Sequence, residues 1–152
     1  MKKKFNNVNI LVGFLAALVS IIGFTMMIMP KSSNNITGKW HMSSKISNAD
    51  KKAYIGAEVQ WDMFLTENNN SVKGSAEKIL INNIPVDYKQ RTALEFEGVI
   101  KNNKLFLNYI ENGKIRKTFG LIEVVIQKNK LLGTFAQTAS NTKGTIEAYK
   151  MD

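Results

Sequence analysis

The sequence predicts an all-β protein: an eight-stranded antiparallel up-and-down β-barrel preceded by one N-terminal transmembrane helix. Residues 10–29 contain no charge, the chain after residue 35 alternates between apolar and polar residues, and asparagine- or glycine-containing turns separate the alternating segments. Eight strands are about the number that closes into a barrel filled by side chains or by one small ligand. We therefore divide the chain into a transmembrane anchor (1–30), a polar tether (31–35) and a barrel domain (36–152). A sandwich of two sheets is the main structural alternative.

The leader has the length of a membrane span. Its uncharged run, as a helix rising about 1.5 Å per residue, is roughly 30 Å long, which matches the hydrocarbon core of a bilayer. A cleaved signal peptide is the alternative, because "MKKK" is a suitable positive start. Such a peptide has an apolar run of about 7–15 residues that ends in small residues. Here the run is longer and ends "TMMIMPK", which favours a retained anchor in the bacterial inner (cell) membrane, crossing it once.

Small side chains recur along the leader at helical spacing, which places them in a stripe on one face. Such stripes allow transmembrane helices to approach closely, and we interpret this one as a surface for self-association and expect a homo-oligomer. The alternative is that small residues are simply common in such helices. The stripe comprises Gly13, Ala16, Ala17, Ser20 and Gly23.

The charge of the chain is +9, and part of it belongs to the leader. Lys2, Lys3, Lys4 and Lys31 flank the apolar run, which leaves 17 basic against 12 acidic residues elsewhere. The lysines that precede the span favour a cytoplasmic N-terminus and an exported barrel, although the side remains open. The mild excess in the domain is compatible with an anionic ligand or a lipid surface. It is more typical of a solubilising surface, and we expect no DNA or RNA polymer as a partner.

Eight segments with the period of a strand follow the tether. The clearest is "GAEVQWDMFLT", in which Val59, Trp61, Met63 and Leu65 fall on one face and only Phe64 breaks the alternation. "ENNN" then closes a hairpin, because asparagine tolerates left-handed backbone. The segments, in order, are "ITGKWHMSSKI", "GAEVQWDMFLT", "SVKGSAEKIL", "RTALEFEGVI", "LFLNYIE", "IRKTFGLIEVVIQ", "LLGTFAQT" and "GTIEAYK".

The connections between these segments predict consecutive hairpins. "KNNK" and "KNK" are tight turns, and "ENGK" is a signal for a type I′ hairpin of two residues. Glycines inside the segments suit the bends of a closing barrel; they are Gly74, Gly98, Gly120, Gly133 and Gly144.

Trp40 enters the first segment within "TGKWHM", and we predict that it plugs the closed end of the barrel. Gly38-Lys39-Trp40 at the start of an eight-stranded meander resembles the Gly-x-Trp signature of the lipocalin–avidin (calycin-like) barrels. That resemblance implies a lipocalin-like domain with one open and one closed end.

No set of residues indicates catalysis. The chain has no cysteine and a single histidine, His41, so neither a disulfide framework nor a metal centre is expected. Glu95 and Glu97 have the spacing of an acid/base pair, but their alternation with Leu94 and Phe96 favours a solvated outer face. We expect no enzymatic activity and no cofactor.

Ligand binding is the natural use of a small barrel, whose mouth is a preformed concave site. The connection "SNADKKAYIGA" is the best candidate for a lid over that mouth. The predicted ligand-binding residues are three aromatic side chains and the two arginines, which have the planar fork suited to phosphate or carboxylate: Tyr54, Trp61, Arg91, Tyr109 and Arg116. The alternatives are core packing for the aromatic residues and ordinary surface charge for the arginines.

The layout of the whole chain, with the phrases "LLGTF" and "GTIEAYK", resembles the transmembrane β-barrel effectors of bacterial anti-phage signalling, the CBASS type and its relatives. That resemblance implies a small anionic ligand, such as a cyclic oligonucleotide, and assembly of membrane segments that damages the inner membrane. A membrane-anchored, extracytoplasmic lipocalin-like protein that binds a lipid or other apolar molecule is the alternative. A barrel filled solid, acting as a structural module, is a third.

Overall fold

A computed structural model of the chain describes residues 35–114 and 116–152. The predicted anchor (1–30) and its small-residue stripe lie outside these residues, as does most of the tether. The compact unit that contains the described residues runs from Asn34 to Asp152. Within the described ranges, no helix is long and apolar enough to cross a membrane.

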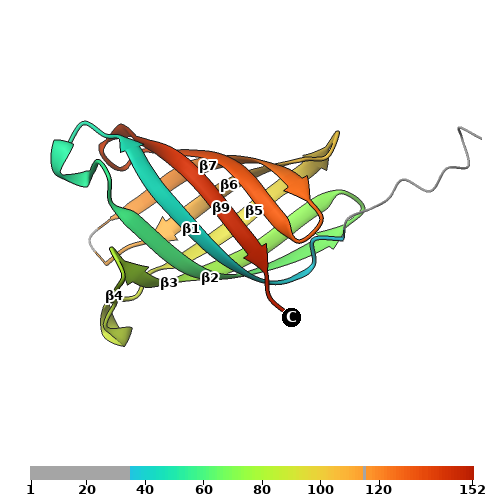
Figure 1. The fold of residues 1–152 in the computed structure, drawn as a ribbon, viewed down its shortest axis with the longest axis horizontal. Helices are drawn as coiled ribbons and strands as arrows, with labels where there is room; N and C mark the ends of the chain where they lie inside the picture. Colours follow the sequence, from blue (N-terminus) through green and yellow to red (C-terminus); the bar gives the residue numbers. More distant parts are fainter. Residues whose placement is uncertain (1–34, 115) are drawn as a thin grey trace, which may run out of the picture. The chain divides into compact units, whose positions relative to one another are not determined.

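Nine strands and three short 3-10 helices make up the described chain (Figure 1). Their bounds, in order, are β1 Gly38–Asn48, η1 Lys52–Tyr54, β2 Glu58–Asn68, β3 Ser71–Ile81, β4 Ile84–Pro85, η2 Tyr88–Gln90, β5 Ala93–Lys101, β6 Lys104–Asn112, β7 Lys117–Gln127, β8 Lys130–Gln137, η3 Ala139–Asn141 and β9 Thr142–Lys150.

Eight of these strands form one closed antiparallel barrel. Each of the eight pairs with its neighbours along the chain, β9 returns to pair with β1, and a β2–β3 pairing closes the circle. Closure removes the unpaired edges that an open sheet exposes. The predicted up-and-down barrel is therefore confirmed, and the two-sheet sandwich is wrong. The ninth strand, β4, is an addition that pairs only with the end of β3.

The alternation of apolar and polar residues sets which side chains enter the barrel. In β2, Trp61, Met63 and Leu65 are buried, whereas Asp62 and Phe64 point outward. The same pattern in β5 buries Leu94 and Phe96 and exposes Glu95 and Glu97, as predicted. The interior is a continuous apolar cluster to which all eight barrel strands contribute.

Asparagine pairs form several of the tight turns. Asn69 and Asn70 between β2 and β3 have φ values of 50° and 67°, and the Asn102–Asn103 turn between β5 and β6 is similar. Both turns were predicted from the asparagines. The two-residue turn predicted at "ENGK" is wrong: β6 ends at Asn112, β7 starts at Lys117, and Gly113 does not take a positive φ.

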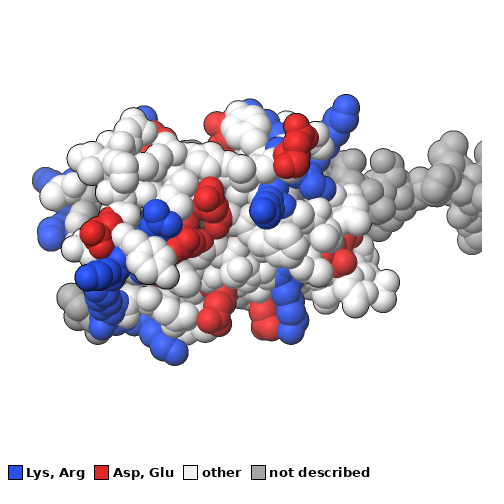
Figure 2. Space-filling model, turned by 90° about the horizontal axis from the view of Figure 1, so that it is seen from below, with Lys and Arg blue, Asp and Glu red and all other residues white. Residues whose placement is uncertain are grey.

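The two ends of the barrel differ. One end carries the β2–β3, β5–β6 and β7–β8 turns and the segment that leads from Asn35 into β1. The Trp40 side chain lies at this end and is completely buried. The other end, which we call the mouth, carries the longer connections with η1, β4, η2 and η3 (Figure 1). On the side of the barrel in Figure 2, basic and acidic side chains are interspersed rather than gathered into one patch.

Candidate ligand-binding site at the barrel mouth

A small cavity of about 70 Å³ lies inside the barrel toward the mouth. A cavity needs about 10–15 Å³ of such space for one water molecule, so this one holds a few waters or a group of a few heavy atoms. All eight barrel strands contribute side chains to its wall: Met42, Ser44, Ile46, Val59, Trp61, Lys78, Leu94, Tyr109, Glu111, Ile122, Phe135, Gln137 and Ile146.

The polar part of this wall is organised around an ion pair. Lys78 Nζ lies 2.5 Å from Glu111 Oε1, and the same oxygen accepts a hydrogen bond of 2.7 Å from the Thr92 hydroxyl. The Lys78 ammonium also lies 4.8 Å from the centre of the Trp61 ring, a cation–π contact. The Lys78 and Glu111 side chains are only 17% and 14% exposed. A pair this enclosed requires mutual neutralisation, because an isolated buried charge is strongly unfavourable.

A β-bulge gives Lys78 its position. In the β2–β3 pairing Trp61 lies opposite Lys78 and Gln60 lies opposite Leu80, so Ile79 is the additional residue on β3. Up to Lys78, every second residue of β3 faces the interior, from Val72 through Ala76. The bulge therefore comes just after Lys78 has been directed inward beside Trp61.

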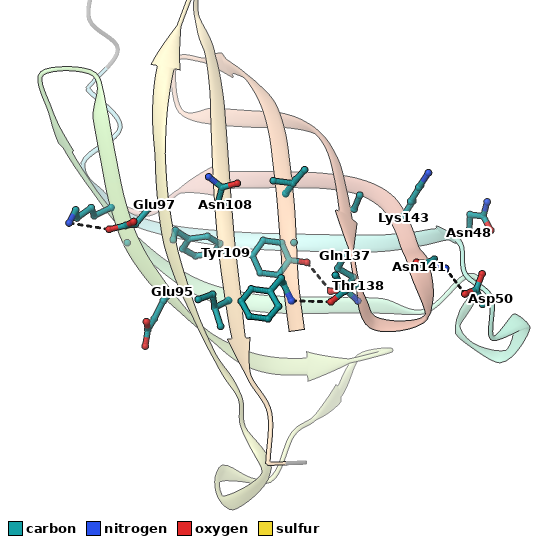
Figure 3. A pocket seen from close by; sticks show the side chains of 18 residues that line it. Asn48, Asp50, Glu95, Glu97, Asn108, Tyr109, Gln137, Thr138, Asn141 and Lys143 are labelled. Atoms are coloured by element: carbon teal, nitrogen blue, oxygen red, sulfur yellow. Dashed lines mark hydrogen bonds and ion pairs between the residues drawn. The ribbon is translucent and has the colours of Figure 1, made fainter. Parts of the chain in front are cut away.

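Tyr109 extends the polar wall across to β8. Its hydroxyl donates a hydrogen bond of 2.8 Å to Gln137 Oε1, and Figure 3 shows these two side chains directed toward each other. Gly120, opposite Tyr109 on β7, makes room for the ring, because a Cβ there would lie 2.2 Å from it. Burial, and to a smaller extent the charge of Glu111, raise the pKa of the Tyr109 phenol above its ordinary value of 10.0. Tyr109 is therefore a neutral hydrogen-bond donor.

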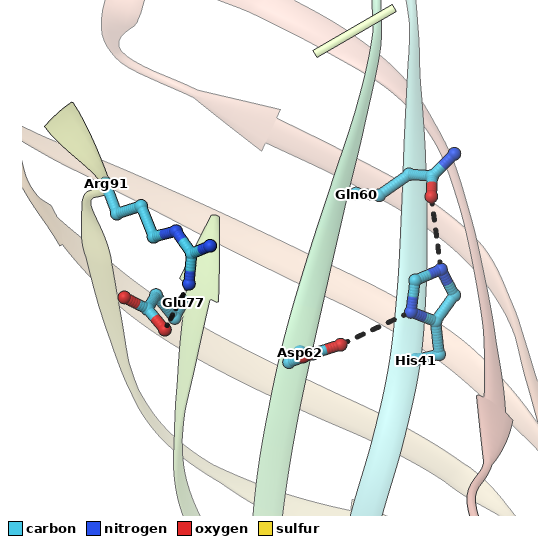
Figure 4. A network of polar contacts seen from close by, with 5 residues as sticks. All are labelled: His41, Gln60, Asp62, Glu77 and Arg91. Atoms are coloured by element: carbon cyan, nitrogen blue, oxygen red, sulfur yellow. Dashed lines mark hydrogen bonds and ion pairs between the residues drawn. The ribbon is translucent and has the colours of Figure 1, made fainter. Parts of the chain in front are cut away.

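The structure brings two of the five predicted ligand-binding residues, Trp61 and Tyr109, together in this cavity. Arg91 is not with them. Its Nη1 lies 3.4 Å from Glu77 Oε2, and its guanidinium lies 5.9 Å from the Tyr88 ring. Figure 4 shows Arg91 and Glu77 together on the outside of β3.

His41 also belongs to an outer network. Its two ring nitrogens lie 3.4 Å from Asp62 Oδ1 and 3.3 Å from Gln60 Oε1 on the neighbouring strand β2 (Figure 4). His41 is the single histidine of the sequence. Within residues 35–114 and 116–152, no group of three or more His, Asp or Glu side chains is placed to hold a metal ion.

Tyr54 and Arg116 are exposed and do not line the cavity. Tyr54 closes η1, where Lys51 Nζ lies 4.8 Å from the centre of its ring. The connection predicted as a lid is attached to the rim of the mouth instead, because Asn141 Nδ2 donates to Asp50 Oδ2 at 2.7 Å. It holds Ala49 buried but places no aromatic ring in the cavity.

Sequence reasoning missed three polar residues of the site. Lys78, Glu111 and Gln137 continue the inward positions of strands whose earlier inward residues are apolar, such as Leu105, Leu107 and Tyr109 before Glu111. Counting every second residue to the end of each strand would have directed all three into the barrel. A polar residue in an inward position near a barrel mouth was the available signal.

No known protein-family model matches this chain, and no curated protein sequence is significantly similar to it. The resemblances to lipocalin–avidin barrels and to transmembrane β-barrel effectors therefore stay predictions from the layout of the chain. The described residues define a closed antiparallel β-barrel with an internal cavity at its mouth, a fold compatible with ligand binding.

Proposed function

We propose that the barrel is a binding module, without catalytic activity, for a small molecule or for one end of a larger one, which enters the mouth. The observation that carries this proposal is the cavity beside the Lys78–Glu111 pair, whose wall is mostly apolar. Its polar side chains are Ser44, Lys78, Tyr109, Glu111 and Gln137. Pockets with mostly apolar walls and a few convergent polar groups are typical ligand sites. The part of a ligand that fits this cavity is therefore amphipathic, with an apolar portion and a polar end.

The polar end of this ligand is uncharged. Lys78 is the one cation in the cavity wall, and Glu111 already neutralises it at 2.5 Å. An additional buried anion would leave a net negative charge in a confined apolar space, which is unfavourable. An amide or hydroxyl group, in contrast, exchanges hydrogen bonds with Gln137, Glu111 and Lys78 without disturbing this balance.

The predicted anionic ligand has less support from this geometry. The two arginines expected to clamp it lie outside the cavity, and Arg91 is paired with Glu77. A cyclic oligonucleotide also exceeds the cavity, because pockets for drug-sized ligands measure about 300–1,000 Å³. Such a ligand would contact the rim and insert one group.

We expect butanamide and butan-1-ol to bind the full-length protein in lipid nanodiscs, and butanoate and butylammonium to bind much more weakly at pH 7. At about 0.5 kcal/mol per non-hydrogen atom, the dissociation constant for butanamide is on the order of 10 mM. Ligand-observed saturation-transfer NMR measures binding in this range.

The matched variants are Ser44→Leu, which fills the cavity, and Ser43→Leu, whose side chain points to the outer face. We expect Ser44→Leu to abolish the butanamide signal and Ser43→Leu to retain it. Preferential binding of butanoate would reverse the assignment in favour of an anionic ligand. Equal signals from all four probes in both variants would show that the probes partition into the lipid and that the barrel has no binding site for them.

We further propose, from the sequence, that the leader anchors the barrel in the bacterial inner membrane and that its helices associate through the small-residue stripe. Ligand-driven pairing of barrels would raise the effective concentration of the tethered helices, as an anti-phage effector requires. What supports this proposal is the uncharged run of residues 10–29 and the spacing of Gly13, Ala17 and Ser20.

Substituting isoleucine for Gly13 and Ala17 tests the stripe. If helix packing acts as proposed, the double variant loses the toxicity of the overproduced wild-type protein in bacteria but binds butanamide unchanged. Isoleucine at Leu11 and Leu15 is the matched control. Toxicity that survives the substitution at Gly13 and Ala17 would show that this helix face is irrelevant.

A further inference from the structure

Lys78 is a primary amine in the wall of an enclosed, mostly apolar cavity. Of the lysines within residues 35–114 and 116–152, it alone lines this cavity. Its side chain is 17% exposed, whereas that of Lys73, earlier on the same strand, is 76% exposed. Proteins use lysine amines in apolar pockets to form Schiff bases with carbonyl compounds. Lys78 therefore has the surroundings in which an amine condenses with a carbonyl ligand.

Glu111 supplies the acid–base group that such a condensation needs. Its Oε1 lies 2.5 Å from Lys78 Nζ and also accepts the hydrogen bond of 2.7 Å from the Thr92 hydroxyl. A carboxylate in contact with an ammonium group is placed to take its proton, which leaves the uncharged amine that attacks a carbonyl carbon. Enclosure lowers the cost of this transfer, because ions lose stabilisation when they are removed from water.

We propose that Lys78 captures an aldehyde as a reversible Schiff base, and that Glu111 stays paired with the iminium that results. This inference rests on the proposed function, because the aldehyde is a ligand of the proposed kind, with an apolar portion and an uncharged polar end. It adds a covalent bond to that binding.

The condensation balances without any further reactant. Glu111 accepts one proton from the Lys78 ammonium, and the free amine attacks the aldehyde carbon. One N–H proton passes to the carbonyl oxygen, which gives a carbinolamine. Glu111 then returns its proton to the carbinolamine hydroxyl, which leaves as water while the nitrogen lone pair forms the C=N bond. Hydrolysis by water from the mouth reverses these steps, so the ligand is bound and released without turnover.

The charge of the pair favours an aldehyde over acylating compounds. An iminium keeps the positive charge of Lys78 beside Glu111 and near the Trp61 ring, whose centre lies 4.8 Å from Nζ. An ester or thioester would convert the amine into a neutral amide. Glu111 would then be an uncompensated charge in a confined space, which is strongly unfavourable.

The size of the cavity favours an aldehyde over a ketone. A ketone carries a second carbon substituent beside the new C=N bond, and the cavity measures only about 70 Å³. Met42, Leu94 and Ile122 are among the apolar side chains of its wall. We therefore expect a short-chain aldehyde, or the end of a longer one that extends through the mouth.

Reductive trapping of butanal tests the inference in the full-length protein, in nanodiscs of phosphatidylcholine, a lipid without a primary amine. An uncharged amine–borane reduces the imine to a stable butyl-lysine, which peptide mass spectrometry locates. At low butanal concentration we expect Lys78 to be modified to about ten times the extent of Lys73, because the apolar wall concentrates the alkyl chain beside its amine. Butanal labelled with ¹³C at the carbonyl carbon shows the iminium signal by NMR without a reductant.

Matched variants identify the amine and the cavity. Lys78→Arg keeps a positive charge beside Glu111 but has no amine that condenses with an aldehyde, and it should lose an iminium signal that Lys73→Arg retains. Ser44→Leu, which fills the cavity, should reduce the modification of Lys78 to that of Lys73, whereas Ser43→Leu on the outer face should preserve the preference. Excess butanamide should compete in the same way as Ser44→Leu.

The outcomes separate this inference from the proposed function. If butanamide binds beside Trp61 but butanal modifies Lys78 no more than Lys73, and no iminium signal depends on Lys78, the inference is wrong and the proposed function stands. If neither compound binds, both are wrong. Preferential modification of Lys78 that persists in Ser44→Leu, or that butanamide does not suppress, would place the reaction outside the cavity and contradict the inference.

Discussion

Replacing Trp40 with alanine is expected to lower the free energy of unfolding by about 3–5 kcal/mol. The Trp40 side chain is completely buried, and its indole N–H donates a hydrogen bond of 2.8 Å to the carbonyl oxygen of Ile36. Around it, the Ile36 N–H donates to Glu67 and Lys150 donates to the Asn35 carbonyl. The ring therefore joins the start of the domain to the interior.

Chemical denaturation of the purified protein, followed by near-ultraviolet circular dichroism, measures this effect. Phe64→Ala is the matched control, because Phe64 is an aromatic residue on the outer face, and its loss should change stability by less than about 1 kcal/mol. A Trp40→Ala protein as stable as the Phe64→Ala control would show that Trp40 does not plug the barrel.

The second large effect is expected at the ion pair in the mouth. Lys78→Met leaves the Glu111 carboxylate in a confined space with Thr92 as its remaining partner, and we expect the stability to fall by about 3 kcal/mol. The double variant Lys78→Met/Glu111→Leu removes both charges and should recover to within about 1 kcal/mol of the wild type.

Lys73→Met is the matched control for this pair. Lys73 and Glu97 form an ion pair at 3.1 Å in which both side chains are about three-quarters exposed. Removing an exposed partner changes stability by about 0–1 kcal/mol. Equal small effects of Lys78→Met and Lys73→Met on stability would contradict the claim that the Lys78 and Glu111 charges must compensate each other. A double variant as unstable as Lys78→Met would contradict it as well.

The strands were predictable because one face of each strand is buried. A one-residue error in register would transfer Trp61, Met63 and Leu65 to solvent, so the period-two pattern determines which side chains enter the barrel. The turns at Asn69–Asn70 and Asn102–Asn103 were predictable for a local reason, since asparagine tolerates positive φ. "ENGK" carried the same local signal but forms a longer connection, and the short β4 has no alternating pattern to reveal it.

The site was only partly predictable because it depends on contacts between distant segments. Trp61 and Tyr109 were identified as aromatic residues in strand patterns, but Lys78 reaches Glu111 across 33 positions of the chain. The bulge at Ile79 depends on how β2 and β3 pair, which no local pattern shows. Arg91 has the chemistry of an anion clamp, yet its partner Glu77 lies on the outside of the barrel.

The proposed function rests on the claim that a small uncharged polar group enters the barrel beside Trp61. The chain has two tryptophans, and Trp61 lines the cavity whereas Trp40 does not. Titration with butanamide, followed by the two indole N–H signals in the ¹H–¹⁵N spectrum of the labelled protein, therefore carries its own control. We predict that the Trp61 signal moves progressively and saturably while the Trp40 signal stays in place. A Trp61 signal that does not move, or two signals that move together without saturating, would contradict the claim.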